Sequence, residues 1–346
     1  MAPENTYYLC FPGTWKKEPL KWHPFDPASH ADHPIRTAYF SGVFQAMEQH
    51  LRHRGLTFYL TPDLRTLPRY GPDVVAVIQG DEAARIPAYF HRVRATFKCY
   101  GTRQVRLPGL FTRPSYQNLL AHTQRLRDIA RRLPGRLHQA RQRLLHPDTL
   151  PPIYPIPLGY ANQLALPIKP ITERTADVFF AGSVAHSSKR LRRWFGSPKE
   201  QGRLRMLAAL EQVRRERPDL RVDLRLQSNF RHSIKASAAA YSEGLMNARI
   251  CLVPRGASFE TYRFFEAMRY GCITLAEALP PYWFYENAPV VTISDWKELP
   301  YILPALLADE EAMQTRHAAT LAWWETRCSE TVVGHYFAEK LNSPGP

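Results

Sequence analysis

Apolar runs of strand length alternate with helical stretches along the first half of the chain. The predicted strands are Tyr7–Phe11, Leu56–Leu60, Asp73–Gln79 and Ala95–Tyr100. Apolar residues at helical spacing lie between and after them and predict helices over Ile35–Arg54, Glu82–Val93 and Ser115–His146, the last range holding two or more helices. Alternation of this kind is typical of a mostly parallel sheet flanked by helices, so the fold class is predicted to be α/β.

The second half repeats the alternation. Its predicted strands are Val178–Ala181, Arg221–Leu226, Ile250–Val253, Ile273–Leu275 and Val290–Ile293. A last helical stretch covers Asp309–Leu341. The proline-rich segment Pro151–Pro170 is typical of a connection between domains. We therefore predict a first domain over residues 1–155, a linker over 156–174, a second domain over 175–310, and a C-terminal helix over 311–346 that crosses back to the first domain.

The segment Ala248–Leu275 is the most informative part of the chain. Pro254 ends a buried strand, and Arg255–Ser258 forms a loop of small residues with one cation. A helical pattern follows over Phe259–Tyr270, and Gly271 stands where a C-terminal cap belongs. A strand, a short loop and a helix in this order place backbone N–H groups and a positive helix end beside an anion.

Three charged residues, Glu260, Arg263 and Glu266, fall on one arc of this predicted helix. One interpretation is a chain of surface salt bridges at i, i+3 spacing, which is common on solvent-facing helices. The other is a binding site, in which the guanidinium group meets an anion and a carboxylate accepts hydrogen bonds from a ligand.

A resemblance to a known family favours the binding site. LVPRG (Leu252–Gly256) followed by YRFFEAMRYGCITL (Tyr262–Leu275) resembles the nucleotide-sugar-binding segment of the exostosin family of glycosyltransferases. Upstream, DVFFAGS (Asp177–Ser183) resembles the strand and turn that open the same domain of that family, and YSEGLMN (Tyr241–Asn247) the helix before the Pro-Arg-Gly strand. The ordered match extends from about Asp177 to Pro300.

The resemblance implies the GT-B arrangement, in which two doubly wound Rossmann-like domains face each other across a cleft. It places the nucleotide sugar on the second domain and the acceptor on the first. Arg255 and Arg263 are then candidates for the donor diphosphate, and Glu266 for the ribose hydroxyls. Gly256 and Ser258 complete the loop beside the donor.

A second phosphate contact is expected at the turn Gly182–Ser183. Ser183 would contribute it together with Lys189 or Arg190. The alternative is an ordinary turn between a strand and a helix, with exposed cations. The chain has no acidic-any-acidic triplet suited to Mg²⁺ or Mn²⁺, so the transfer is expected to be metal-independent, without any cofactor, and inverting.

An inverting transfer needs a general base near the acceptor hydroxyl. Asp81 and Glu82 follow the predicted strand Asp73–Gln79 and are the first candidates, and burial or like charge is expected to raise the pKa of one of them. Alternatively, Asp81 caps the helix that follows. The loop after the first strand offers Asp32 and His33 as competing bases, and its histidines have no usual metal spacing.

The composition of the chain indicates a folded protein without membrane-spanning segments. The chain has 346 residues, 45% of them hydrophobic and 12% aromatic, which excludes a disordered chain. Its five cysteines are scattered without metal-binding spacing. No apolar run reaches the length of a membrane span, and no secretory signal is recognisable, so a soluble, cytoplasmic, bacterial-type relative of the exostosins is expected.

The formal net charge is +15, concentrated in Arg125–Arg143 and Lys189–Arg205. The simplest interpretation is the solvated faces of amphipathic helices. Peripheral contact with the anionic inner face of a membrane is the next, since lipid-linked glycans are frequent acceptors. Nucleic acid is disfavoured because no known binding module is present.

The sequence thus predicts an exostosin-like glycosyltransferase that moves a sugar from a nucleotide-sugar donor, UDP-sugar favoured, to a glycan or lipid-linked acceptor. A role in building capsule, lipopolysaccharide or another glycoconjugate would suit it. One alternative is a GT-B transferase of another family, such as a fucosyltransferase-like enzyme that uses a GDP-sugar. Another is an inactive GT-B-like protein that binds anionic glycan or nucleic acid.

Overall fold

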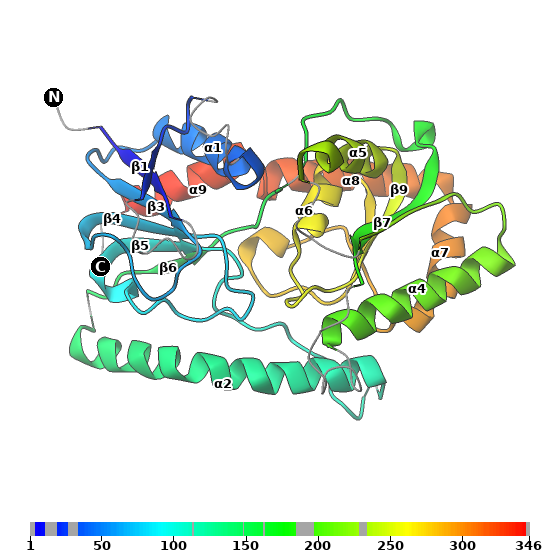
Figure 1. Cartoon of the computed structure of the whole chain (residues 1–346), viewed down its shortest axis with the longest axis horizontal. Helices are drawn as coiled ribbons and strands as arrows, with labels where there is room; N and C mark the ends of the chain where they lie inside the picture. The colour runs from blue at the N-terminus through cyan, green and yellow to red at the C-terminus, as the bar shows by residue number, and fades with distance from the viewer. Residues whose placement is uncertain are drawn as a thin grey trace. The chain divides into compact units, whose positions relative to one another are not determined.

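The computed structural model describes residues 4–10, 19–26, 34–112, 114–147, 149–161, 163–184, 197–227 and 234–343. The chain divides into two units, each with its own sheet (Figure 1). The first unit contains Met1–Gln104, Leu126–Ala161 and Arg327–Pro346. The second unit contains Val105–Arg125 and Asn162–Thr326. The sequence also predicts that the first domain binds the acceptor and the second binds the donor. This assignment of ligands stays a prediction.

The first unit is built on a sheet with the strand order β2-β1-β3-β4-β5-β6. The strands are β1 (Thr6–Leu9), β2 (Leu20–Trp22), β3 (Thr57–Thr61), β4 (Gly71–Ile78), β5 (Val93–Lys98) and β6 (Ile153–Pro155). Strand β2 is antiparallel to β1, and the others are parallel and follow one another in chain order. Phe58–Leu60 of β3 and Val74–Ile78 of β4 are buried apolar runs, as expected for parallel strands covered on both faces.

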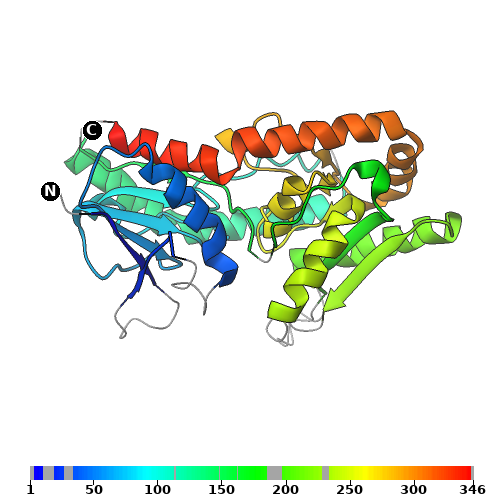
Figure 2. The ribbon, with the colours of Figure 1, turned by 90° about the horizontal axis from the view of Figure 1, so that it is seen from above.

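Two helices distant in sequence cover this sheet together. Helix α1 (Pro34–Glu48) contacts helix α9 (Glu330–Asn342), and the two lie side by side in both views (Figure 1, Figure 2). Phe337 of α9 stacks on Phe97 of β5, with ring centroids 3.7 Å apart. The C-terminal helix is therefore part of the core of the first unit.

The second unit is built on a parallel sheet with the strand order β11-β10-β9-β7-β8. Its strands are β7 (Ala176–Ser183), β8 (Val222–Gln227), β9 (Ala248–Val253), β10 (Ile273–Ala276) and β11 (Val291–Thr292). Its helices are α4 (Pro198–Glu216), α5 (Ile234–Met246), α6 (Tyr262–Arg269), α7 (Leu299–Ala308) and α8 (Glu310–Arg327). Counted along the chain, the order is 2-1-3-4-5, so it reverses between β7 and β9.

Local sequence sets the ends of the helices beside this sheet. Ser197 and Glu200 form a capping box at the start of α4. Gly271 has a φ of +71°, and its N–H and that of Cys272 donate to the carbonyls of Met268 and Ala267. This is a Schellman ending of α6, and it confirms the C-terminal cap predicted at Gly271.

The predicted α/β class with two mainly parallel sheets is confirmed, but two local predictions, over Glu82–Val93 and Ser115–His146, are wrong. Glu82–Val93 is not a helix: Asp81 and Ala84 have positive φ, Pro87 lacks a donor, and only a 3-10 turn forms at Phe90–Arg92. Ser115–His146 holds one helix, α2 (Tyr116–Leu145), rather than several. The proline-rich Pro151–Pro170 contributes strand β6 to the first sheet.

Helix α2 continues through Pro134, which lies on its exposed side. The carbonyl group freed one turn earlier can therefore meet water. Within the described ranges, no helix combines the length and the apolar character needed to cross a bilayer.

Candidate functional site

The carboxyl ends of β7 and β9 form the reversal point of the second sheet. The two strands are parallel neighbours. Helix α4 connects β7 to β8, and helix α6 connects β9 to β10. In open parallel sheets, ligands bind outside the carboxyl ends at such a point. The end of β7 is Ala181–Ser183, and Pro254 and Arg255 follow β9 directly.

Two arginines converge on the end of β7. The Nη2 group of Arg263 donates to the carbonyl of Ala181, and Nη1 of Arg203 donates to the carbonyl of Ser183 over 2.5 Å. A Cβ atom on Gly182 would lie 2.7 Å from Nη2 of Arg263 and 3.5 Å from Nη1 of Arg203. The guanidinium group of Arg263 therefore occupies the space that a side chain at Gly182 would fill, whereas that of Arg203 lies at ordinary contact distance.

Arg263 has unused hydrogen-bonding capacity. Its Nε and Nη1 atoms are buried and have no hydrogen-bond partner among the described residues. No carboxylate in those ranges forms an ion pair with it, and its guanidinium carbon lies 4.7 Å from the ring centroid of Phe180. Buried guanidinium nitrogens without a hydrogen-bond partner are costly, so this position is suited to an anionic ligand.

The segment between β7 and α4 adds positive charge by its composition. Residues 185–196 lie outside the described residues, and so do the predicted contacts Lys189 and Arg190. This stretch contains one lysine, three arginines and no acidic residue. Ser183, the third predicted contact, is buried at the end of β7, and its carbonyl accepts the hydrogen bond from Arg203.

Arg255 is held rigidly behind the loop that follows β9. The residue is 2% exposed, its Nη2 donates to Oε1 of Gln124 over 2.6 Å, and its guanidinium carbon lies 3.8 Å from the ring centroid of Phe259. Its backbone N–H donates to Oε1 of Glu277 over 3.2 Å, and Trp296 donates to the same oxygen over 3.1 Å. These contacts fix the orientation of the guanidinium group.

A small recess lies beside Arg255. It lies between the start of α2 and the start of α4 and is too narrow to hold a water molecule. Its lining residues are Gln117, Leu120, Pro198, Gln201, Gly202, Arg205 and Arg255. Arg255 lies at the wall of this recess and is almost fully buried, so a ligand group reaches it only when the surrounding side chains move.

The loop Arg255–Ser258 folds on itself. The N–H of Gly256 donates to the carbonyl of Ser258 over 2.9 Å, and Oγ of Ser258 accepts from the N–H of Glu260 over 3.3 Å. The turn uses the N–H of Gly256 internally, so this group is not directed at a ligand in the observed conformation.

The surface salt-bridge interpretation of Glu260, Arg263 and Glu266 is wrong. Both glutamates are buried, and Arg263 forms no ion pair with either of them. Oε2 of Glu266 accepts from the Tyr241 hydroxyl over 2.7 Å, and Oε1 of Glu260 accepts from the Tyr285 hydroxyl over 3.1 Å. Burial and then Glu266 raise the pKa of Tyr241 well above its ordinary value, so this hydroxyl stays a donor.

In the first unit, Asp81 follows β4 and is enclosed by cations. Its Oδ2 lies 3.2 Å from Nζ of the buried Lys98, and its Oδ1 lies 2.8 Å from Nε of Arg85. Burial alone would raise its pKa, but Lys98 and then Arg85 lower the pKa below its ordinary value. The expected rise of the pKa is therefore wrong for Asp81, because no local pattern indicates the buried lysine.

Asp81 is also not a helix cap, since no helix follows it; its carboxylate accepts from the N–H of Arg85 in a turn. Glu82 is exposed. Asp32 and His33 lie outside the described residues. The catalytic assignments of these four residues stay predictions. Within the described ranges, no three His, Cys, Asp or Glu side chains come together as metal ligands.

Arg203 and Lys98 were not foreseen from the sequence. Arg203 lies in the basic stretch Lys189–Arg205, where its neighbours share its residue type, and only the packing of α4 directs it to β7. Lys98 ends an apolar strand pattern and has no local signal of its ion pair, since Asp81 follows the neighbouring strand.

No protein-family model and no curated protein matches the chain. Among solved structures, it is similar to a GtfA/B complex, with 13% identity over 79% of this chain and 57% of that chain and a TM-score of 0.41. It is also similar to TarM, with 11% identity, 79% and 55% coverage and a TM-score of 0.40. The chain thus spans little more than half the length of these two.

A third similar structure covers more of both chains. It is sucrose-phosphate synthase from Thermosynechococcus elongatus, with 11% identity over 91% of this chain and 80% of that chain and a TM-score of 0.41. With TM-scores below 0.5, none of these similarities is an argument for a shared activity.

Proposed function

We propose that the chain is a GT-B glycosyltransferase whose second unit binds a nucleotide-sugar donor. The observation that carries the proposal is the half-buried Arg263, whose two buried nitrogens have no partner among the described residues, beside Arg203 at the reversal point of a parallel sheet. Guanidinium groups match the oxygens of a diphosphate in charge and geometry. The exostosin-like segments support the same site, because Arg263 belongs to their Arg-Phe-Phe-Glu-Ala stretch.

The proposed chemistry is displacement at the anomeric carbon of the donor sugar. An acceptor hydroxyl oxygen attacks that carbon, its proton goes to a general base, and the bond to the diphosphate breaks. Negative charge builds on the departing diphosphate, where Arg203 and Arg263 stabilise it without a metal ion. Attack from the opposite side inverts the anomeric centre. We favour a UDP-sugar as donor and a glycan or a lipid-linked glycan as acceptor.

Two further residues have proposed roles at the donor. Arg255 would contact the diphosphate after the end of β9 once the side chains that cover it move, while Gln124 and Phe259 hold its guanidinium group in place. Glu266 would accept hydrogen bonds from the ribose diol, and the Tyr241 hydroxyl would fix its carboxylate. The role of Glu266 is testable apart from that of Tyr241, since Tyr241→Phe keeps the carboxylate.

The base is the least constrained part of the proposal. Lys98 and Arg85 keep Asp81 charged but lower its pKa, which makes it a weak proton acceptor. Glu82, Asp32 and His33 are the other candidates. Turnover of Asp81→Asn, Glu82→Gln, Asp32→Asn and His33→Ala, measured side by side, would identify the base by a loss of about 10²–10⁴-fold with nucleotide affinity unchanged.

A nucleotide screen tests the proposed function. Thermal unfolding with UDP, GDP, CDP, CMP and dTDP should show a rise in Tm for one diphosphate, since a ligand bound only to the native state stabilises it. Slow hydrolysis of the matching nucleotide sugar without acceptor would establish transfer chemistry. A chain that binds no nucleotide and hydrolyses no donor would contradict the proposal.

A further inference from the structure

Helix α2 exposes its apolar side. Residues 126–145 of α2 belong to the first unit and carry six exposed large apolar side chains. At about 100° of rotation per residue, five of the six fall within an arc of about 80° around the helix axis. These five are Leu126, Ile129, Leu133, Leu137 and Leu144, each between 44% and 85% exposed. They are called the leucine stripe below.

The opposite side of α2 contacts its own unit through polar and small residues. Nε of Arg132 donates to the carbonyl of Ala83 over 2.5 Å, and Nε2 of His138 lies 3.3 Å from Nδ1 of His91. A Cβ atom on Gly135 would lie 3.3 Å from Ile86. The usual amphipathic arrangement is therefore reversed: hydrogen bonds fix the inner side, and the leucines point away from the unit.

A row of exposed apolar side chains along one helix is typical of a surface that binds a membrane or another protein. The stripe runs along about 27 Å of helix from Leu126 to Leu144, at about 1.5 Å per residue. A single exposed apolar side chain needs no explanation, but four leucines and one isoleucine on one side of a helix leave a large apolar area facing water.

Arginines border the stripe. Arg136 and Arg143 lie about 60–80° to one side of Leu133 around the helix, and Arg141 lies about 80° to the other side. None of these three forms an ion pair within the described ranges. Residues 126–145 contain six arginines and a single acidic residue, Asp128, which pairs with Arg127 over 3.4 Å.

We infer that this side of α2 binds the surface of an anionic lipid bilayer. The leucine stripe enters the boundary between headgroups and acyl chains, and the bordering arginines meet lipid phosphates. Charge favours this occupant over a second copy of the chain. Two stripes paired with each other would bring rows of arginines together, and like charges across an interface oppose association. The inference does not depend on the proposed glycosyl transfer.

Flotation of the full chain with vesicles tests it. We expect binding to phosphatidylcholine vesicles that contain phosphatidylglycerol and little binding to phosphatidylcholine alone. The variant Leu126→Gln/Leu133→Gln/Leu137→Gln should bind at least roughly tenfold more weakly, since each buried leucine contributes about that factor. Its matched control is Leu204→Gln/Leu226→Gln, which removes exposed leucines of the second unit and should bind like wild type.

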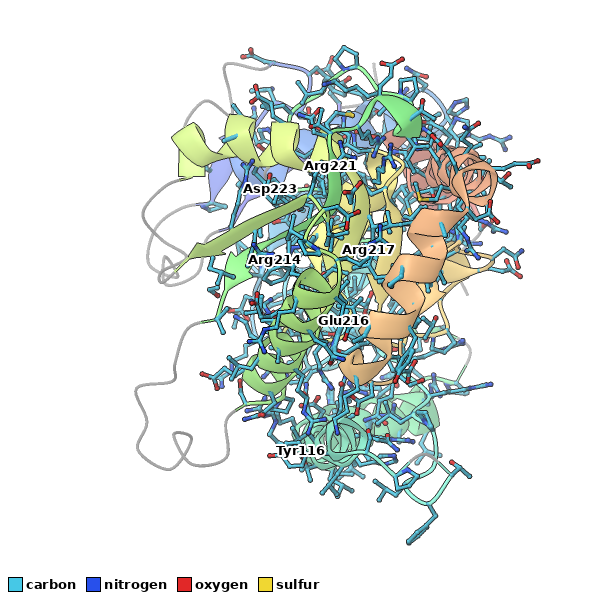
Figure 3. All side chains as sticks on the ribbon, turned by 90° about the vertical axis from the view of Figure 1, so that its right-hand side faces the viewer. Tyr116, Arg214, Glu216, Arg217, Arg221 and Asp223 are labelled. Atoms are coloured by element: carbon cyan, nitrogen blue, oxygen red, sulfur yellow. The ribbon has the colours of Figure 1, made fainter. Side chains whose placement is uncertain are left out.

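A second pair of variants tests the contribution of positive charge to vesicle binding. Arg136→Gln/Arg143→Gln should lower binding to the anionic vesicles roughly 25-fold, because each arginine near such a surface contributes about a factor of five. Arg214→Gln/Arg215→Gln removes the same charge from α4, where Figure 3 labels Arg214, and should have little effect. The Leu137→Trp variant should show a blue-shifted tryptophan emission on binding, relative to wild type, which adsorption by charge alone would not cause.

Three results would each overturn the inference. They are failure of wild type to float with anionic vesicles, flotation of the glutamine variant of the stripe equal to that of wild type, and an unshifted emission of the bound Leu137→Trp variant. A wild-type dimer that the stripe variant converts to a monomer would assign the surface to a second copy instead. Unchanged Tm values show that the variants are folded, as expected for exposed positions.

Discussion

Gly182 and Arg263 together decide what the end of β7 is able to bind. The glycine leaves room for the guanidinium group of Arg263, which keeps two buried nitrogens unpartnered among the described residues. Such a group raises the free energy of the unliganded fold and is compensated when an anion binds. The same unpartnered nitrogens therefore lower the stability of the unliganded protein and increase its affinity for an anion.

Gly182→Ala should weaken nucleotide diphosphate binding by roughly tenfold or more, because its Cβ would displace the guanidinium group of Arg263. Isothermal titration measures the affinity. Gly80→Ala is the matched control, since its Cβ would meet its nearest atom at an ordinary 3.5 Å. Equal affinity in Gly182→Ala and wild type would contradict the placement of the diphosphate beside Arg263.

Asp81→Asn should destabilise the fold by about 3–5 kcal/mol, because it leaves Lys98 buried without its counter-charge. Urea unfolding checks this, and adding Lys98→Met should restore much of the loss. Since the folded pKa of Asp81 lies below its ordinary 3.8, the pair stabilises the fold above that pH and loses this effect as pH falls through the folded value. A stable Asp81→Asn variant without turnover would instead identify Asp81 as the base.

At the scale of elements, the ending of α6 fixes the strand that follows it. Gly271→Ala should lower the free energy of unfolding by about 1–3 kcal/mol, because φ is +71° there and a Cβ would lie 2.5 Å from Nδ1 of His317. Gly256→Ala is a milder control, with its nearest contact at 3.4 Å and no positive φ. Equal unfolding midpoints for the two variants would show that the cap contributes nothing.

Buried parallel strands were the elements best predicted from the sequence. DVVAVIQ and ARICLV are apolar runs bounded by glycine or proline, and both became central strands. The helix predicted over Glu82–Val93 failed because Pro87 and the turn around Asp81 outweigh helical periodicity. The orientation of α2 could not be foreseen either, since periodicity locates an apolar side without telling what covers it.

The candidate site was predicted in part. Spacing and resemblance pointed to Arg255, Arg263 and Glu266, and the structure places them after β9 and on α6. Their partners were not predictable: Gln124 and Tyr241 come from other elements, and a hydrogen bond between distant segments has no local signal. For the same reason, the ion pair of Lys98 with Asp81 was missed.

At the scale of the whole molecule, the excess positive charge is the basis for predicting that the proposed reaction needs no divalent ion. The net charge is +15, and arginines are present at the proposed diphosphate position. Turnover should persist in EDTA, because guanidinium groups stabilise the leaving diphosphate. The rate with and without chelator checks this, and loss of activity restored by Mn²⁺ or Mg²⁺ would contradict the metal-independent proposal.

The central claim is that the second unit holds a nucleotide diphosphate through Arg263. Its most direct test is titration of wild type and Arg263→Gln with UDP and UMP, or with the corresponding pair of the best nucleotide from the screen. Arg214→Gln, on the exposed end of α4 (Figure 3), is the matched control. We expect Arg263→Gln to lose roughly 10- to 150-fold in affinity for the diphosphate, about 1.5–3 kcal/mol, and less for the monophosphate. Equal diphosphate affinity in wild type and Arg263→Gln would contradict the account.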